Sequence, residues 1–207
     1  MDADQIETLF VGPQGYRFAR WGRPIVPIVF GVEDETLQTL KGAIEAVVAL
    51  AGHKMAETDP ELGANLLFFF FRDWDELVDV KDLDQVIPDL GKLLERLKAA
   101  DANSYRLFRF DEAGAIKAAF VFMRADSEML SLPAEDLALS EAVKMILLWS
   151  DGAFKPHGPL AKAGDTVVLR PDIAALIAAA YDPVMPLTAD DKSHALRLAA
   201  RAGAASA

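Results

Sequence analysis

Apolar and polar positions follow different periods along the first third of the chain, and these periods predict two strands and a helix. Residues 18–30 are typical of extended structure, and the β-branched run 25–30 ends it. Pro27 cannot donate a ladder hydrogen bond, so we expect this strand at a sheet edge. Apolar residues then recur at helical spacing over 33–52. The uninterrupted apolar run within 65–71 predicts a central strand that is covered on both faces.

The middle of the chain predicts a helical insert followed by a hairpin. Residues 73–101 are acidic and carry leucines at helical spacing, and Pro88 should divide this insert into two pieces. The runs 104–110 and 115–123 flank a turn that ends in Gly114. They should therefore form two antiparallel strands of the main sheet.

The last third of the chain is predicted to be mostly helical. A helix should begin at Pro133 and run through residue 149, and its apolar end indicates the buried central helix. Residues 151–165 are rich in Gly and Pro and predict a loop, and 166–169 predict a short strand. Another helix should cover 171–181, because proline is favoured at the first helical position.

The order of these elements predicts one α/β (α+β) domain over residues 1–207. A mixed sheet of four to five strands covered by helices is the economical packing of that order. Near the C-terminus, Thr188 with Asp191 matches a capping box for a last helix. The small-residue tail 202–207 should be frayed.

Charge and composition narrow the possible function classes. The chain carries 32 acidic residues against 21 Lys and Arg, which gives a net charge of -11. Such a charge repels phosphate backbones, so we expect no nucleic-acid partner. The absence of Cys excludes disulfides, thiolate nucleophiles and Cys-based metal sites. The start resembles no signal peptide, and no apolar run approaches a membrane span, so we expect a soluble cytoplasmic protein without a membrane partner.

The scattered basic side chains indicate structural roles. Three arginines within 17–23 interleave with aromatic residues, which strand alternation explains, with arginines outward and aromatics inward. His53 follows a predicted helix end, where a cation is favoured, and should be structural or exposed. His194 should form an exposed ion pair with Asp190. No two histidines stand at ligand spacing, so we expect no metal and no cofactor.

The loop 151–165 holds the one local concentration of ligand-type residues. Lys155, His157 and Lys162 form a basic island in an acidic chain, and Lys155 and His157 are candidates to bind an anion. The alternative is an ordinary solvated loop. Loops of this length are often functional or mobile, so we expect a surface lid with Lys155 and His157 at its tip.

Residues 140–151 stand where a zincin metallopeptidase carries its His-Glu-x-x-His helix. Ser140 and Lys144 replace the two histidines, so the chain should not bind catalytic zinc. The stretch more closely resembles an uncharacterised bacterial family of zincin-like proteins with a Glu-x-x-Gln version of this helix. The other matching segments are Arg20-Trp21, Leu169-Arg170-Pro171-Asp172 and Ala180-Tyr181-Asp182-Pro183. The resemblance covers about residues 20–186 and implies a zincin-like outline, with a cleft beside Glu141 that the loop borders.

Three functions fit the resemblance and the basic loop. The leading hypothesis is a non-catalytic interaction or regulatory protein, a pseudoenzyme that contacts another protein. The second is a metal-independent hydrolase in which Glu141 or Asp151 acts as the base, which a pocket with a raised Glu141 pKa would favour. The third is a binding module for a small acidic ligand, held by the basic loop residues. A plain surface pair between Glu141 and Lys144 is the alternative without function.

Overall fold

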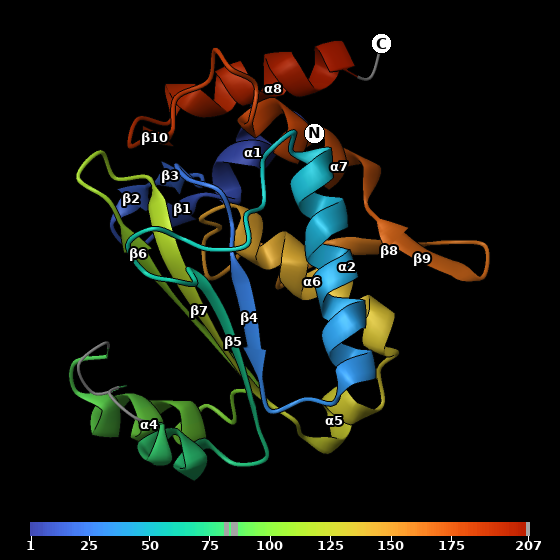
Figure 1. Cartoon of the computed structure of the whole chain (residues 1–207). Helices are drawn as coiled ribbons and strands as arrows, with labels where there is room; N and C mark the ends of the chain where they lie inside the picture. Colours follow the sequence, from blue (N-terminus) through green and yellow to red (C-terminus); the bar gives the residue numbers. More distant parts are fainter. Residues whose placement is uncertain (81–82, 84–86, 206–207) are drawn as a thin grey trace.

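A four-stranded mixed sheet forms the centre of the structure, a computed structural model that describes residues 1–80, 83 and 87–205. The strands in spatial order are β4 (Pro27–Phe30), β5 (Leu66–Phe71), β7 (Ile116–Arg124) and β6 (Ser104–Phe110). The first three run parallel, and β6 pairs antiparallel with β7 (Figure 1). The prediction of a mixed α/β fold with a sheet of four to five strands is confirmed, as is the place of the hairpin in that sheet.

Two predictions for the strands, a covered central strand and an edge strand, are confirmed. Strand β5 lies inside the sheet, and its residues alternate between two buried apolar clusters. Leu66 and Phe68 belong to one cluster, whereas Phe69 and Phe71 belong to the other. Strand β4 lies at the edge, where Pro27 costs no ladder hydrogen bond. The unbroken apolar run is therefore explained by burial on both faces.

Helices α2 (Asp34–Leu50) and α6 (Ala134–Ile146) pack together on one face of the sheet (Figure 1). The prediction that the central helix runs through residue 149 is wrong at its end. Leu147 is extended and forms a β-bridge with Arg20, and the Leu148 N–H donates to Ala19. Residues 145–149 are apolar because an extended buried segment, like a buried helix, has no face toward solvent.

The opposite face is covered by a 3-10 helix, η1 (Trp74–Asp79), and by α4 (Leu90–Ala99). These are pieces of the predicted acidic insert, one on each side of Pro88. Residues 81–82 and 84–86 of that insert lie outside the described part of the chain. The side chains of both helices pack on β5 and β7 in the second apolar cluster.

The other elements in the described part of the chain lie outside the four-stranded sheet. They are α1 (Ala3–Thr8), β1 (Val11–Gly12), β2 (Gly15–Tyr16), β3 (Phe18–Ala19), α5 (Ser127–Leu130), β8 (Leu160–Ala163), β9 (Thr166–Leu169), α7 (Pro171–Ala180), β10 (Thr188–Ala189) and α8 (Ser193–Ala205). None of the helices in the described part combines the length and apolar character that crossing a bilayer requires.

Two predictions for the C-terminal third are corrected. The loop 151–165 is shorter than predicted, because β8 pairs antiparallel with β9 in a hairpin that projects from the body (Figure 1). Gly164 turns this hairpin with a φ of 65°, a left-handed conformation that glycine adopts without strain. Helix α8 continues to Ala205, so the described part of the tail 202–207 is helical rather than frayed; residues 206–207 lie outside it.

The predicted capping box of the last helix is also wrong in part. Thr188 lies in β10, which pairs with β3, and it cannot cap a helix from there. Asp191 does act at the start of α8, because its Oδ1 accepts the N–H of Ser193 at 2.7 Å. Residue spacing alone suggested the box, whereas the sheet pairing of Thr188 depends on a strand far away in sequence.

Candidate functional site

A cavity of about 420 Å³ lies between α6, α5, the β8–β9 hairpin and the adjoining ends of β6 and β7. Helix α6 contributes Asp136, Leu137, Ser140, Glu141 and Lys144 to its wall. These residues recur at three- and four-residue steps, so they share one face of the helix. The helix that the sequence singled out therefore does border a cavity.

The rest of the lining is apolar with a few polar groups. The apolar residues are Met123, Met129, Leu132, Pro159, Leu160, Ala161 and Val167, and the others are Asn103, Ser104, Gly158 and Lys162. Apolar walls with a small number of placed polar groups are typical of sites that bind small molecules.

Glu141 is buried at this wall, with 2% of its surface exposed. Its Oε2 accepts a hydrogen bond from Arg106 Nη2, and its Oε1 accepts one from Lys144 Nζ at 2.9 Å. Arg106 comes from β6 and Lys144 from the next turn of α6. We call these three residues the charged triad. The predicted pair of Glu141 with Lys144 exists, but its place on the helix surface was wrong.

The charged triad fixes the protonation of its carboxylate. Burial by itself would raise the pKa of Glu141, but the charges and hydrogen bonds of Arg106 and Lys144 outweigh burial and hold that pKa below its ordinary value. Glu141 is therefore ionised near neutral pH, with both oxygens engaged. A general base works best with a pKa near the working pH, so this arrangement disfavours Glu141 as a base.

The other residues proposed from the sequence do not line the cavity. Asp151, Lys155 and His157 are exposed in the turns before β8. The second half of the predicted loop, from Gly158 to Lys162, does reach the cavity. The predicted loop and Glu141 thus border one cavity, through residues 158–162. The prediction that Lys155 and His157 form the tip of this loop is wrong, because they lie in the turns before β8.

Sequence reasoning missed Arg106 as a site residue. Its side chain occupies a position of β6 that faces α6, between Ser104 and Phe108 in the alternation of the strand. A charged residue at an inward strand position requires a partner, and that was the available signal. Lys162, the third member of the basic island, lines the cavity from β8, and among the described residues no hydrogen bond or ion pair holds its side chain.

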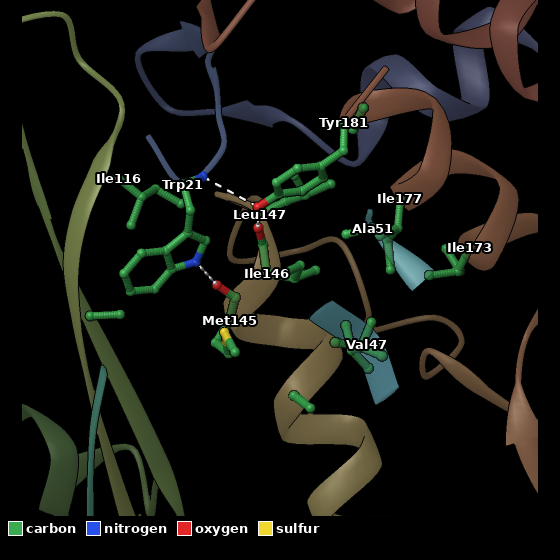
Figure 2. Packing of buried hydrophobic residues seen from close by; sticks show 14 of the residues in the cluster. Trp21, Val47, Ala51, Ile116, Met145, Ile146, Leu147, Ile173, Ile177 and Tyr181 are labelled. Atoms are coloured by element: carbon green, nitrogen blue, oxygen red, sulfur yellow. Dashed lines mark hydrogen bonds between the residues drawn. The ribbon is translucent and has the colours of Figure 1, made fainter. Parts of the chain in front are cut away.

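Two of the segments quoted for the family resemblance, those of Trp21 and Tyr181, meet at the end of α6 (Figure 2). The indole Nε1 of Trp21 donates to the Met145 carbonyl at 2.9 Å, and the Tyr181 hydroxyl donates to the Ile146 carbonyl at 2.9 Å. The Trp21 N–H donates to that same hydroxyl at 3.3 Å. These bonds satisfy carbonyls that a helix end leaves unpaired. Trp21 and Tyr181 therefore hold the end of α6 and stand outside the cavity lining.

The predicted outward direction of the arginines holds only in part. Tyr16 and Phe18 are buried and Arg17 is exposed, as expected from alternation. Arg20 is half-buried, because its guanidinium donates to the carbonyls of Met185 and Pro186. Its side chain therefore binds the segment after α7 rather than pointing into solvent.

Of two histidines with predicted settings, His194 differs from its prediction and His53 has the structural place that was one of its two predicted roles. His194 is 3% exposed, and its Nδ1 is bonded to the Tyr16 hydroxyl at 2.8 Å, so the exposed ion pair with Asp190 is wrong. Burial lowers the pKa of His194 to about 4. The half-buried His53 bonds the Arg23 carbonyl through Nε2, and burial lowers its pKa too, so it is not favoured as a cation. In the described ranges no cluster of three or more His, Asp or Glu could hold a metal ion.

Comparison with known proteins adds no relative. No family model, curated protein or solved structure matches the chain. The similarity to the zincin-like family therefore rests on the sequence motifs quoted above and stays a prediction.

Proposed function

We propose that the protein is a non-catalytic binding module that holds a small acidic ligand in the cavity beside Glu141. One observation carries the proposal. The buried carboxylate of Glu141 lies between Lys144, which lines the cavity, and Arg106, which does not, so the charged triad keeps one net positive charge beside a largely apolar cavity. Lys144 uses one of its three N–H donors on Glu141, which leaves donors for a ligand.

The charge balance of the whole site supports an anion. Among the lining residues, the positive charges of Lys144 and Lys162 balance the negative charges of Glu141 and Asp136. Arg106 lies outside the lining, but its ion pair with Glu141 adds the third positive charge. Asp136 lies in the first turn of α6, where the helix dipole favours an acidic side chain. The site therefore keeps one positive charge, although the chain has a net charge of -11. Charges farther from the site than a Debye length of ~8 Å are largely screened, so the nearby charges dominate.

The hydrolase hypothesis has less support. It needed a raised pKa on Glu141, and the pKa is lowered instead. Its other candidate base, Asp151, lies outside the cavity lining. Turnover of a bound acid is therefore the result that would favour the hydrolase over the binding module.

A second candidate function, contact with another protein, is favoured by one observation. Leu130 and Leu132 are 73% and 51% exposed, and Leu132 also lines the cavity. Apolar side chains beside a ligand site can report its occupancy to a partner. This role is regulatory and builds on the binding proposal rather than replacing it.

Matched pairs of acids and amides test the proposal by thermal unfolding. A carboxylic acid at a hundredfold excess over its Kd should add about 2.7 kcal/mol of stability, which raises Tm by about 5–10 °C for a chain of this length. The corresponding amide should have a much smaller effect. Lys162→Met should reduce the shift, and Lys155→Met, which removes an exposed lysine outside the lining, should not. Equal shifts for acids and amides across a broad panel would reject an acidic ligand.

A further inference from the structure

The lining of the cavity combines cationic and apolar side chains. On α6, Lys144 lies on the C-terminal half, and Leu137 lies two turns before it with Asp136 beside it. Seven residues of helix span about 10 Å, which separates Leu137 from Lys144 by roughly that distance. A ligand that meets both Lys144 and the apolar residues needs an acidic end and an apolar body.

The apolar part of the wall comes from several elements. Met123 belongs to β7, Met129 to α5, and Leu160 and Val167 to the two strands of the hairpin. Together with Leu137 they offer no polar side-chain group to a ligand body. Methionine side chains adapt to irregular shapes, which suits a flexible aliphatic chain better than a rigid polar ring.

Size and charge limit the ligand further. A volume of about 420 Å³ accommodates roughly 14 groups of the size of a water molecule, at about 30 Å³ each. The single positive charge left by the site matches one carboxylate. A phosphate dianion would leave a surplus negative charge in apolar surroundings, which is unfavourable.

We infer that the cavity takes an apolar monocarboxylate, an aliphatic chain of about ten to twelve carbons whose carboxylate binds at Lys144 and Lys162. The inference rests on the proposed function and names the ligand class for it. The chain of the acid lies toward Met123, Met129 and Leu137.

Calorimetric titration of the whole protein with sodium decanoate tests the ligand class. Decanoate should bind, and each methylene removed should weaken binding about fourfold, so that butanoate binds far more weakly. Decyl phosphate, decanol and decylammonium should each bind at least about tenfold more weakly than decanoate, because none supplies a single negative charge.

Methionine methyl NMR locates the bound probe. The methyl signals of Met123 and Met129 should shift on addition of decanoate, while those of Met55 and Met185, which do not line the cavity, stay in place. Lys162→Met should weaken decanoate about tenfold or more and leave decanol unchanged. Lys155→Met is the matched control and should bind decanoate as the unmodified protein does.

The outcomes separate the two proposals. Butanoate equal to decanoate, or decyl phosphate tighter than decanoate, overturns the aliphatic monocarboxylate and leaves an acidic ligand in place. Decanol equal to or tighter than decanoate overturns the acidic ligand itself. Shifts confined to Met55 or Met185, or no binding of any probe, also overturn the inference.

Discussion

The two faces of the central sheet bury different kinds of side chain. On the α4 side, Phe69, Phe71 and Phe122 stack on one another beneath Trp74. On the α6 side, the sheet and helix also bury the carboxylate of Glu141 and leave a cavity beside it. The α6 side holds the larger apolar cluster, and it also carries a buried charge and a cavity near the ends of β6 and β7. The contrast shows that the charged triad and the cavity are confined to one side of the sheet.

The largest effect should come from opening the aromatic face. Phe122→Ala removes a fully buried ring between Phe69 and Tyr105, and it should lower the free energy of unfolding by about 3–5 kcal/mol. Urea unfolding measures this. Phe30→Ala is the control: its ring stacks on Phe69 but is 43% exposed, so the loss should be well under half as large. Equal losses for both variants would contradict a tightly packed face.

Lowering the pH should reduce the stability of the fold through His194, which burial keeps uncharged. His194 has a pKa of about 4 in the fold and 6.5 when unfolded, so the unfolded chain binds more protons between these values. Its contribution to stability is therefore complete above about pH 6.5 and is lost as pH falls toward 4, with a total of about 3 kcal/mol. Glu141, whose folded pKa is lowered, loses its contribution only below its ordinary value, 4.5.

Urea unfolding at pH 7, 5.5 and 4 checks this separation. His194→Gln keeps a hydrogen-bonding group for Tyr16 but does not titrate, so the decline between pH 6.5 and 4 should become shallower. If the variant keeps the full decline in the free energy of unfolding, groups other than His194 cause that decline.

Removing the negative charge on the α6 side should cost somewhat less. Glu141→Gln leaves Arg106 and Lys144 near each other without a counter-charge, and we expect a loss of about 2–3 kcal/mol, since both cations keep some solvent contact. Replacing all three with apolar residues, as Arg106→Met, Glu141→Leu and Lys144→Met together, should restore much of the stability. The triple variant should at the same time lose affinity for acids, measured by calorimetry.

The smallest effect concerns the junction that holds α6 in place. Tyr181→Phe removes one hydroxyl, which leaves the buried Ile146 carbonyl and Trp21 N–H without their partner, at a cost of about 1–2 kcal/mol (Figure 2). The thermal midpoint measures the loss, and ligand affinity should be unchanged. A variant that keeps its stability but loses affinity would instead connect Tyr181 to the cavity.

The sequence predicted elements whose pattern has one physical explanation. An apolar strand such as β5 needs two covered faces, and Pro27 in β4 needs a free edge, so both were placed correctly. The end of α6 was misplaced because Leu147 and its neighbours would be apolar in a buried helix or a buried strand alike.

The site was harder to predict, because its partners come from distant parts of the chain. Glu141 has Lys144 three residues away, which the sequence revealed, but Arg106 lies 35 residues away on a strand. Burial of Glu141 depends on that second cation, and no local pattern reports it. The same holds for His194, whose partner Tyr16 is 178 residues distant.

The β8–β9 hairpin has a consequence for how this fold can change over evolutionary time. It forms a two-stranded sheet separate from the four central strands, yet it supplies Leu160, Lys162 and Val167 to the cavity wall. Substitutions at these positions should change the wall of the cavity and leave the pairing of the central strands unaltered. Under the proposed function, the segment that sets ligand preference is therefore separate from the sheet that holds the fold together.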